Sequence, residues 1–415
     1  MTSEPWTELA LPEVIEFREG PGIMARDFRE SGVPLIRLAG LSGGDLLEGC
    51  NYLDPAMVDR KWSHFRLRAG DTLLSTSASL GRIARVTPGA DGAIPYTGII
   101  RMRPKDGRVD PDFVQYMLEA PQFQRQVEAM GAGSVMRHFG PSHLTSMKVV
   151  VPPLAEQERI DSVLGALDDK IDSNRRLARL LEEIAQTEFQ ARFVSFVAVE
   201  NLTDREQGPT PAGWEWRPVS ALARYVNGKA FTKFGNGCGR MVIRIADLKS
   251  GPGSSTVYTD HEPDSDDFVA RPGDILFAWS GSLDVYRWHR EEALINQHIF
   301  KVLPDEVPKW LVYLTLKEVM PRFQAIAADK ATTMGHIKRS DLARFAIPVP
   351  PEEELRQFDS FFSPIFDHSL GAVIEAQTLT SIRDSLLPKL VSGQVRVPDT
   401  ADPGEAIEPL VESTT

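Results

Sequence analysis

Two long segments of the chain carry hydrophobic residues at helical spacing, and each follows a pair of prolines. After Pro152 and Pro153, apolar residues recur at a period near 3.5, which is typical of a coiled-coil seam rather than of a broad core face. The helix predicted from Ala155 to about Val197 has roughly 40 residues and a length of about 60 Å, which is typical of a spacer. The residues predicted to pair this helix with another are Ile160, Leu164, Leu167, Ile171, Asn174 and Leu181.

Asn174 is the polar member of this seam. A polar side chain at a seam position costs stability and fixes the register of helix pairing. The alternative is that Asn174 caps a break between two shorter helices. A second helix is predicted from Glu353 to about Leu390, with more aromatic residues on its seam. Pro364 lies inside that pattern, so we expect a kink or a broken first turn there.

The chain also repeats itself at an offset of roughly 200 residues. Residues 36–41 match 243–248, and residues 68–74 match 271–277, each as a strand or a turn that enters a strand. Further matches follow in the same order: 99–102 with 299–302, Met136 and His138 with Met334 and His336, and 149–153 with 347–351. The chain is therefore expected to be two copies of one unit, each a globular domain followed by a helix.

The predicted fold class is α+β, with two similar globular domains separated by two long antiparallel coiled-coil helices. The helices would hold the domains at opposite ends of a rod, as a pseudo-twofold internal repeat. The expected segments are a domain at 1–151, a spacer helix at 152–200, a domain at 201–351, a spacer helix at 352–397, and a disordered acidic tail at 398–415.

Composition places the chain among ordinary globular proteins. Its 415 residues are 42% hydrophobic and 25% charged, which excludes disordered and fibrous classes and suggests two or three domains. Cys50 and Cys238 are the only cysteines and have no CxxC spacing, so a disulfide scaffold is excluded and a zinc site is not expected. We expect a cytoplasmic protein, because the sequence shows neither a secretory signal nor an apolar run long enough for a membrane helix.

The net charge of −12 is unevenly distributed. It is −1 for 1–151, −4 for 152–200, +1 for 201–351 and −8 for 352–415. Each globular domain is therefore close to neutral and can carry a local basic face, although the whole chain is no polycation.

No catalytic motif accompanies this organisation. The sequence contains no GxxxxGK[ST] phosphate loop, GxGxxG fingerprint or HExxH element, and its eight histidines form no metal-ligand cluster. Residues 234–239 resemble a glycine-rich cofactor loop, but no helix is predicted to follow them. The prolines at 152–153 and 350–351 lack the preceding Asp or Asn that the adenine-methylating tetrapeptide requires. A non-catalytic protein without a cofactor or metal of its own is expected.

Clusters of basic, hydroxyl and aromatic residues recur in both copies and are the candidate DNA contacts. Arg and Lys suit phosphates and guanine, and Ser and Thr serve several acceptors and donors. Taken singly, each cluster is better explained as solvated surface; recurrence at corresponding places in two copies is what favours binding. The candidates are Arg26, Arg29, Arg60, Lys61, His64, Arg66, Arg137 and His138 in the first domain, and Lys229, Lys233, Arg287, His289, Arg290, Lys330, Thr332, Thr333, His336, Lys338 and Arg339 in the second.

Several motifs resemble those of the specificity subunits of type I restriction-modification systems. They are Val150-Val151-Pro152-Pro153-Leu154-Ala155-Glu156-Gln157 with its long helix, Gly70-Asp71 and Gly273-Asp274 before strands, Ile295-Asn296-Gln297-His298-Ile299, and Leu386-Leu387-Pro388-Lys389-Leu390. The resemblance covers the chain except for the tail. It implies two target-recognition domains that each read half of a bipartite DNA site, with paired helices that set the spacer. It also implies partners: double-stranded DNA, two modification subunits that bind S-adenosylmethionine, and restriction subunits.

The chain departs from the family pattern in two places. The second copy has Leu355 where Gln157 stands in the first, and the first copy has Tyr96-Thr97-Gly98 where the second has Asn-Gln-His. The latter difference makes a structural hydrogen-bonding role for Asn296, Gln297 and His298 at least as plausible as a DNA contact. Two rival functions are an enzyme whose motif is unrecognised and a two-headed scaffold that binds protein. The sequence does not give the DNA half-sites.

Overall fold

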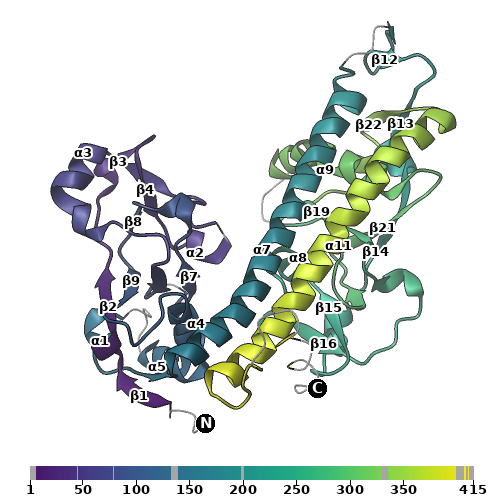
Figure 1. Cartoon of the computed structure of the whole chain (residues 1–415). Coiled ribbons are helices and arrows are strands. Elements are labelled where there is room, and N and C mark those ends of the chain that lie inside the picture. The colour runs from purple at the N-terminus through teal and green to yellow at the C-terminus, as the bar shows by residue number, and fades with distance from the viewer. Residues whose placement is uncertain are drawn as a thin grey trace. The chain divides into compact units, whose positions relative to one another are not determined.

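A computed structural model of the chain describes residues 6–43, 45–77, 79–131, 139–197, 201–329, 335–398, 406–407 and 410. The chain divides into two compact units, unit 1 with Met1–Asp172 and Thr378–Thr415, and unit 2 with Ser173–Gln377. Each unit holds one globular domain together with part of each long helix, so the division falls within both helices (Figure 1).

Unit 1 contains an antiparallel ribbon and two four-stranded sheets. The ribbon pairs β1 (Thr7–Ala10) with β10 (Lys148–Val151). The first sheet has the order β2-β9-β6-β7, with β2 Ile15–Glu19, β9 Ile99–Pro104, β6 Thr72–Ser75 and β7 Ile83–Arg85. The second has the order β3-β5-β4-β8, with β3 Phe28–Arg29, β5 Asn51–Leu53, β4 Val33–Ile36 and β8 Ile94–Pro95.

Unit 2 repeats this plan. Its ribbon pairs β13 (Glu215–Pro218) with β22 (Ala346–Val349), and a short hairpin pairs β11 (Leu202–Thr203) with β12 (Thr210–Pro211). One sheet has the order β14-β21-β18-β19, with β14 Ala223–Asn227, β21 Ile299–Pro304, β18 Ile275–Ala278 and β19 Asp284–Arg287. The other has the order β16-β15-β20-β17, with β16 Val257–Thr259, β15 Arg240–Ile243, β20 Ala293–Ile295 and β17 Val269–Ala270.

Shorter helices complete both domains and follow the same order along the chain. In unit 1 they are α1 (Leu11–Val14), α2 (Gly40–Gly43), α3 (Pro55–Met57), α4 (Phe113–Glu119), α5 (Pro121–Gly131) and α6 (Pro141–Leu144). In unit 2 they are α8 (Ile245–Ser250), α9 (Lys309–Asp329) and α10 (Arg339–Leu342). By position in the repeat, the single helix α9 corresponds to α4 and α5 together.

Matching hydrogen bonds confirm the internal repeat. Gly70 and Gly273 both adopt a positive φ, of 90° and 87°, at the turn that leads into β6 and β18. The aspartate after each glycine accepts a hydrogen bond of 2.8 Å from the backbone N–H three residues before it. The copies differ at one sheet edge, because β3 is added beside β5 whereas β17 is added beside β20.

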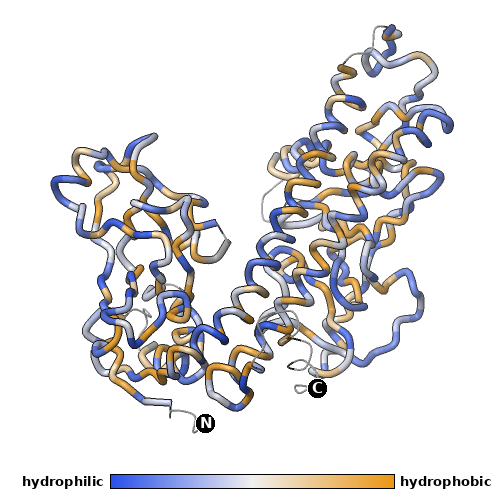
Figure 2. Tube along the Cα trace, in the orientation of Figure 1, coloured by the Kyte–Doolittle hydropathy of each residue, from blue (hydrophilic) through white to orange (hydrophobic). Residues whose placement is uncertain are grey.

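Two long helices follow the two domains and pair with each other within each unit. The first is α7 (Leu154–Phe189), continued by the π-helical turn η5 (Gln190–Val194), and the second is α11 (Glu352–Val391). In unit 2 the pairing is antiparallel, because Ser369 donates to the Ala178 carbonyl at 3.2 Å while the Phe358 and Phe193 rings lie 5.0 Å apart. In Figure 2 hydrophobic and hydrophilic residues alternate along both helices, as an amphipathic helix requires.

The predicted seam residues lie mainly on the inner side of α7. Ile160, Leu164, Leu167, Ile171 and Asn174 are buried, whereas Leu181 is half-buried. The alternative that Asn174 caps a helix break is wrong, since α7 continues through it. The predicted broken turn at Pro364 is also absent, because α11 runs unbroken from Glu352 to Val391.

Aromatic packing accounts for the continuity of α11. Phe362 stacks on Trp310 with ring centroids 4.3 Å apart, and Phe366 lies 5.5 Å from Tyr313. These contacts flank Pro364, whose missing N–H removes only one helical hydrogen bond. Packing of the amphipathic face therefore outweighs the local cost of the proline.

The prediction of a disordered tail at 398–415 is wrong for the residues that the structure describes there. Ala406 and Leu410 are 1% and 3% exposed and belong, with Val397, to the main hydrophobic core of unit 1. Ala406, Ile407 and Leu410 have the i, i+1, i+4 spacing of one helical face, which an acidic average composition conceals. The rest of 398–415, except Pro398, lies outside the described residues.

Gln157 fastens the start of α7 to the preceding domain. Its side chain is fully buried, accepts from the Asp110 N–H at 2.8 Å, and donates to the carbonyls of Arg108 and Pro152 at 2.8 and 2.7 Å. In the second copy Leu355 occupies this position and is buried in an apolar core. The family motif therefore has a structural role in the first copy.

Replacing Gln157 by Ala is expected to lower the unfolding free energy of the chain by about 2 kcal/mol, because one buried and two partly buried backbone groups lose their partner. Chemical denaturation monitored by circular dichroism measures this. Glu158→Ala, which changes an exposed neighbour on the same helix, should leave the midpoint unchanged. Equal stability of Gln157→Ala and the unaltered chain would show that the fastening is unimportant.

A buried acidic cluster lies between α4, α7 and α11 in unit 1. The Tyr116 hydroxyl donates to Asp168 at 2.9 Å, and Arg383 donates to the same carboxylate at 3.0 Å. Burial raises the pKa of nearby Glu119 to about 7, although the Arg383 charge opposes the change. Burial also raises the pKa of Asp161 to about 6.

Acidification should therefore stabilise unit 1. The folded state keeps a proton on Glu119 that the unfolded chain releases above its ordinary pKa of 4.5, so stability falls as the pH rises toward 7. We expect Glu119 alone to lower the unfolding free energy by about 2 kcal/mol between about pH 5 and pH 7, and Asp161 to add to this drop. Urea denaturation at both pH values should show a drop about 2 kcal/mol smaller for Glu119→Gln, with the contribution of Asp161 remaining. Exposed Glu128→Gln on α5 is the control and should keep the full pH dependence.

Candidate nucleic-acid interface

Each domain has a turn that is anchored by a glycine at the end of its first sheet strand. Gly20 follows β2, and Gly228 follows β14. A Cβ atom on Gly20 would collide with the Pro95 carbonyl, and one on Gly228 would collide with the Asn296 carbonyl. Only glycine permits this close approach of two backbones, so both turns leave the sheet at the same place.

A short 3-10 helix follows each anchoring glycine: η1 (Ala25–Asp27) in unit 1 and η7 (Phe231–Phe234) in unit 2. Three residues after the glycine, Ile23 and Phe231 are buried in the small core beneath the second sheet of their domain. Packing of Ile23 and Phe231 thus attaches each turn to its domain and positions the residues that follow. We call these segments, 20–29 and 228–239, the glycine-anchored turns.

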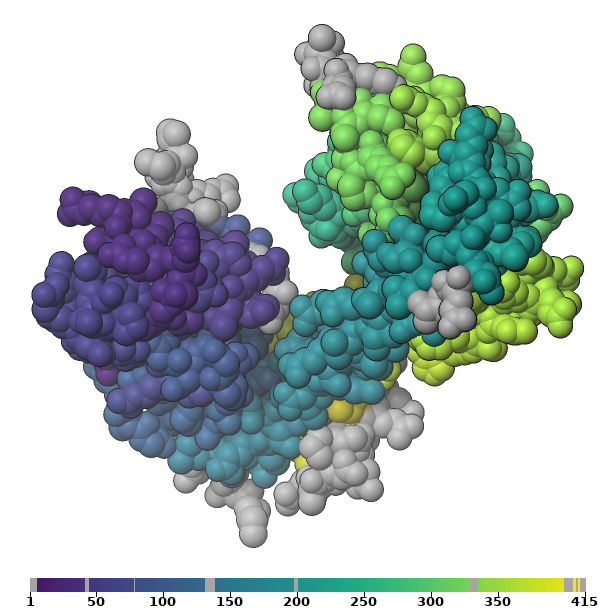
Figure 3. Space-filling model, turned by 90° about the horizontal axis from the view of Figure 1, so that it is seen from above, coloured from purple at the N-terminus to yellow at the C-terminus, as the bar shows by residue number. Residues whose placement is uncertain are grey.

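Both glycine-anchored turns expose an apolar side chain beside a cation. Met24 is 61% exposed and Phe234 is 50% exposed. Arg26 and Lys233 are exposed, and their side chains have no hydrogen-bond or ion-pair partner among the described residues. Figure 3 shows the part of unit 1 that contains the first of these turns, in purple, at the surface of that unit.

Arg29 braces the first turn. Its guanidinium donates to the carbonyls of Arg26 at 3.1 Å and Phe28 at 2.8 Å. In the second copy the buried Thr259 hydroxyl has a similar place, since it donates to the Phe234 carbonyl at 2.7 Å. Arg29 therefore supports the turn, while its exposed position leaves its predicted role as a DNA contact standing.

The π-helical turn η2 (Val58–Trp62) brings two further predicted cations to the same small core. Val58 is buried with Ile23, and Trp62 packs against them. Arg60 and Lys61 are exposed, and neither side chain has a polar partner among the described residues. Arg26, Arg60 and Lys61 are thus available to phosphates.

The next predicted residues of unit 1 are more constrained. Arg66 donates to Asp59 at 2.7 Å and to the Gly92 carbonyl at 3.0 Å, so part of its hydrogen-bonding capacity is used within the fold. His64 is exposed, with its ring 4.2 Å from that of Phe65. The predicted contacts Arg137 and His138 lie outside the described residues.

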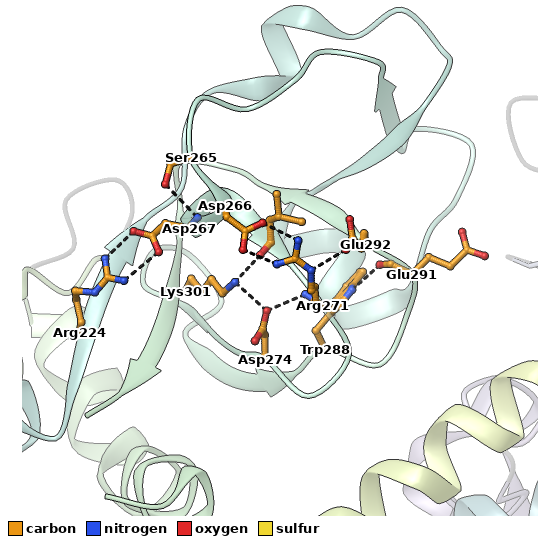
Figure 4. A network of polar contacts seen from close by, with 11 residues as sticks. Arg224, Ser265, Asp266, Asp267, Arg271, Asp274, Trp288, Glu291, Glu292 and Lys301 are labelled. Atoms are coloured by element: carbon orange, nitrogen blue, oxygen red, sulfur yellow. Dashed lines mark hydrogen bonds and ion pairs between the residues drawn. The ribbon is translucent and has the colours of Figure 1, made fainter. Parts of the chain in front are cut away.

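Acidic side chains pair with many of the cations of unit 2. Figure 4 shows this network, in which Arg224 pairs with Asp267 at 2.6 Å and Arg271 bridges Asp266 and Glu292 at 2.6 and 2.7 Å. Lys301 donates to the Val269 carbonyl and pairs with Asp274 at 3.0 Å. Lys301 is therefore not free to bind phosphate, whereas Arg224 and Arg271 form exposed ion pairs, with side chains 60% and 43% exposed.

Lys229 belongs to the same pattern. Its ammonium lies 2.6 Å from Asp264 and 4.5 Å from the centre of the Phe268 ring. The Lys229 ion pair is exposed and can be exchanged for a phosphate at little cost. Lys233 has no such partner in the part of the chain that the structure describes, so it is the cation of this turn that is ready for a phosphate.

The prediction that Arg287 contacts DNA is wrong. Only 7% of its side chain is exposed, and it donates to the Phe366 carbonyl at 2.6 Å, to Ser369 at 2.8 Å and to Glu182 at 3.2 Å. Its guanidinium also lies 4.2 Å from the centre of the Phe366 ring. The position of Arg287 between Tyr286 and Trp288 in the sequence suggested a DNA surface, but its guanidinium packs against Phe366 of α11.

The neighbours of Arg287 are half-buried. Burial lowers the pKa of His289, which favours its neutral form, and burial also lowers the pKa of Arg290. Arg339 donates to the Tyr225 carbonyl, whereas Lys338 is exposed and its ammonium has no partner among the described residues. His336 is exposed, and Lys330, Thr332 and Thr333 lie outside the described residues.

The Asn-Gln-His segment lies against the second glycine-anchored turn. Asn296 is buried, while His298 is exposed and lies 3.2 Å from the Ser280 hydroxyl. The Trp279 ring lies 5.5 Å from that of His298, and its indole donates to Asn227 at 2.8 Å. Trp279, Met24, Phe234 and His261 were missed by sequence reasoning, since no motif marks them.

Within the described ranges, no group of three or more His, Cys, Asp or Glu side chains is placed to hold a metal ion. No described helix combines the length and the apolar character needed to cross a membrane. The available cations and exposed apolar side chains on the glycine-anchored turns and η2, described above, form the candidate interface.

Comparison with known proteins identifies the family. The model of the type I restriction modification DNA specificity domain matches residues 3–183 and again 211–374. The chain belongs to this family. It is a specificity subunit, a non-catalytic component that recognises DNA in a type I restriction-modification system.

Several relatives are similar over most of their length. The chain is 24% identical over 349 residues to the type I restriction enzyme MjaIX specificity subunit of Methanocaldococcus jannaschii, which covers 79% of this chain and 78% of that protein. It is 22% identical over 404 residues to the HindI specificity subunit of Haemophilus influenzae, with 79% and 87% covered. The crystal structure of the S subunit from M. genitalium shares the fold, with a TM-score of 0.59, 14% identity, and 93% and 96% of the chains covered.

Proposed function

We propose that each domain of this specificity subunit reads one half of a two-part DNA site, and that α7 and α11 set the distance between the halves. The observation that carries the proposal is the repeat itself: two copies of one recognition fold present the same glycine-anchored turn with an exposed cation. Two copies of one recognition domain, joined by helices of fixed length, can bind two half-sites at a fixed spacing.

An exposed apolar stripe on α7 supports docking of modification subunits. Leu177, Leu180 and Ile184 are 46%, 49% and 46% exposed, and their i, i+3, i+7 spacing places them on one face of the helix. Arg176 and Arg179 flank the stripe, with side chains that have no polar partner among the described residues. We expect S-adenosylmethionine to bind the modification subunits, with restriction subunits joining the assembly through them.

Leu180→Glu is expected to reduce the number of modification subunits that copurify with the chain, because a carboxylate would be buried in the docked stripe. The fold should be unaffected, since Leu180 is half exposed. Leu202→Glu, on the β11–β12 hairpin, is a matched control at a residue 40% exposed. If light scattering shows the same number of modification subunits per chain for Leu180→Glu, the stripe is not part of the docking surface.

The proposed function is tested by coexpressing the chain with its modification subunit in a host without adenine methylation. Sequencing that detects methylated adenine should then reveal one gapped two-part motif, which disappears when the chain is omitted. A soluble complex that produces no such motif would contradict the proposal and favour a scaffold that binds protein.

A further inference from the structure

The two glycine-anchored turns share a feature that the proposed reading of phosphates and base edges does not require. Each presents an apolar side chain, Met24 or Phe234, that is at least half exposed, and close to it in sequence a cation without a polar partner among the described residues. A single exposed apolar residue on a protein surface needs no explanation. Its recurrence on the same turn of two copies that otherwise differ in sequence indicates a common use.

Phe234 is held in a fixed orientation. Its ring is parallel to that of His261, with an interplanar angle of 5° and centroids 4.0 Å apart. The Phe234 carbonyl is held by Thr259, as described above, and Asn236 donates to Asp260 at 2.7 Å. One face of the Phe234 ring is therefore covered by a histidine, and half of the side chain remains open to solvent.

A flat ring with one covered and one open face fits a flat partner. Nucleic-acid bases stack on aromatic rings, and proteins that insert apolar side chains between base pairs partially unstack the duplex. Lys233, which precedes Phe234, is placed to neutralise the phosphate beside an unstacked base. Met24 and Arg26 offer the same combination in unit 1, with a flexible thioether in place of the ring.

We propose that Phe234 and Met24 are wedges that insert at one base step in each half-site, with Phe234 stacking on a base and Lys233 and Arg26 binding the adjoining phosphates. This inference rests on the proposed reading of two half-sites by the two domains. It adds recognition through DNA deformability, because steps that unstack easily are favoured at the wedge.

The test uses the complex of this chain with its modification subunit. The DNA duplexes carry the two-part motif that methylation mapping identifies. The fluorescent base 2-aminopurine replaces single bases along both half-sites, except at the methylated adenines, since methyltransferases extrude their target base themselves. Complex formation should raise the fluorescence at one step in each half-site. Phe234→Ala should abolish the rise in one half only and weaken DNA binding about tenfold.

Further variants separate stacking from other effects. Phe234→Trp should keep both the signal and the affinity, because indole also stacks, whereas Met24→Ala should abolish the signal in the other half-site. Leu202→Ala removes an exposed apolar side chain outside both turns and should change neither measurement.

The outcomes distinguish this inference from the proposed function. A complex that methylates a two-part motif but shows no fluorescence change, and whose Phe234→Ala variant binds DNA as tightly as the unaltered complex, overturns the wedges alone. A soluble complex that methylates no two-part motif overturns the proposed function and the wedges with it. Binding of Phe234 to the modification subunit would appear as lost copurification with Phe234→Ala, and would also overturn the wedges.

Discussion

Insertion of seven residues into each long helix is expected to lengthen the spacer of the methylated motif by about three base pairs, with both half-sites unchanged. Seven helical residues add about 10.5 Å, and base pairs are stacked about 3.4 Å apart. The insertions belong after Asp172 in α7 and after Gln377 in α11, where the two units divide. A seven-residue insertion also keeps the seam of each helix facing its partner.

The paired contacts on either side of these points show why both helices must be lengthened together. In unit 1 Arg383 bonds to Asp168 at 3.0 Å, and in unit 2 Ser369 bonds to Ala178 at 3.2 Å. An insertion in α7 alone would force one of these pairings out of register, so we expect that variant to lose methylation. Genome-wide mapping of methylated adenine measures both effects.

A matched control places seven residues in the exposed loop at 251–255 of unit 2, where the added chain is not part of the spacer. That variant should retain the original spacer. An unchanged spacer in the doubly lengthened protein, with methylation preserved, would show that the helices do not set the distance between half-sites.

The repeat and the long helices could be predicted from sequence because both depend on local order. The spacing of Ile160, Leu164 and Leu167 indicates the seam of a helix. This periodicity can be recognised without knowing which helix packs against the seam. The turns at Gly70 and Gly273 were found in the same way, since each lies just before a strand with the same pattern in both copies.

The candidate site was less predictable because availability depends on contacts between distant segments. Lys229 and Lys233 are four residues apart and look alike in sequence, yet an aspartate 35 residues away pairs with the first and not with the second. Phe234 is exposed and Phe231 is buried, although both belong to one short turn. Ala406 and Leu410 pack into a core that the acidic composition of the tail conceals.

Arg287 is the clearest case of a predicted DNA contact with a different role, and its replacement has a large expected effect. Arg287→Met should lower the unfolding free energy of the chain by about 3 kcal/mol, because it leaves the Glu182 carboxylate in a partly buried site without its cation. The variant also removes the donors to Phe366 and Ser369 that join β19 to α11. Urea denaturation followed by tryptophan fluorescence measures the change.

A second substitution distinguishes the buried charge from lost packing. Glu182 still accepts from the Tyr313 hydroxyl at 2.5 Å, and burial raises the pKa of that tyrosine, which keeps it a donor. Adding Glu182→Gln to Arg287→Met removes the uncompensated charge and should recover part of the lost stability. The exposed Arg205→Met is the control and should leave the denaturation midpoint unchanged.

Measurements of DNA binding should distinguish a DNA-contact role of Arg287 from a structural role, because the two roles predict opposite effects of its replacement. If Arg287 contacted a phosphate, Arg287→Met would weaken DNA binding and reduce its salt dependence while the chain kept its stability. Because the guanidinium is enclosed by Phe366 and Tyr313, the structure favours the reverse: a less stable chain whose folded fraction binds DNA with unchanged salt dependence. Binding measured well below the unfolding midpoint therefore separates the two roles of this arginine.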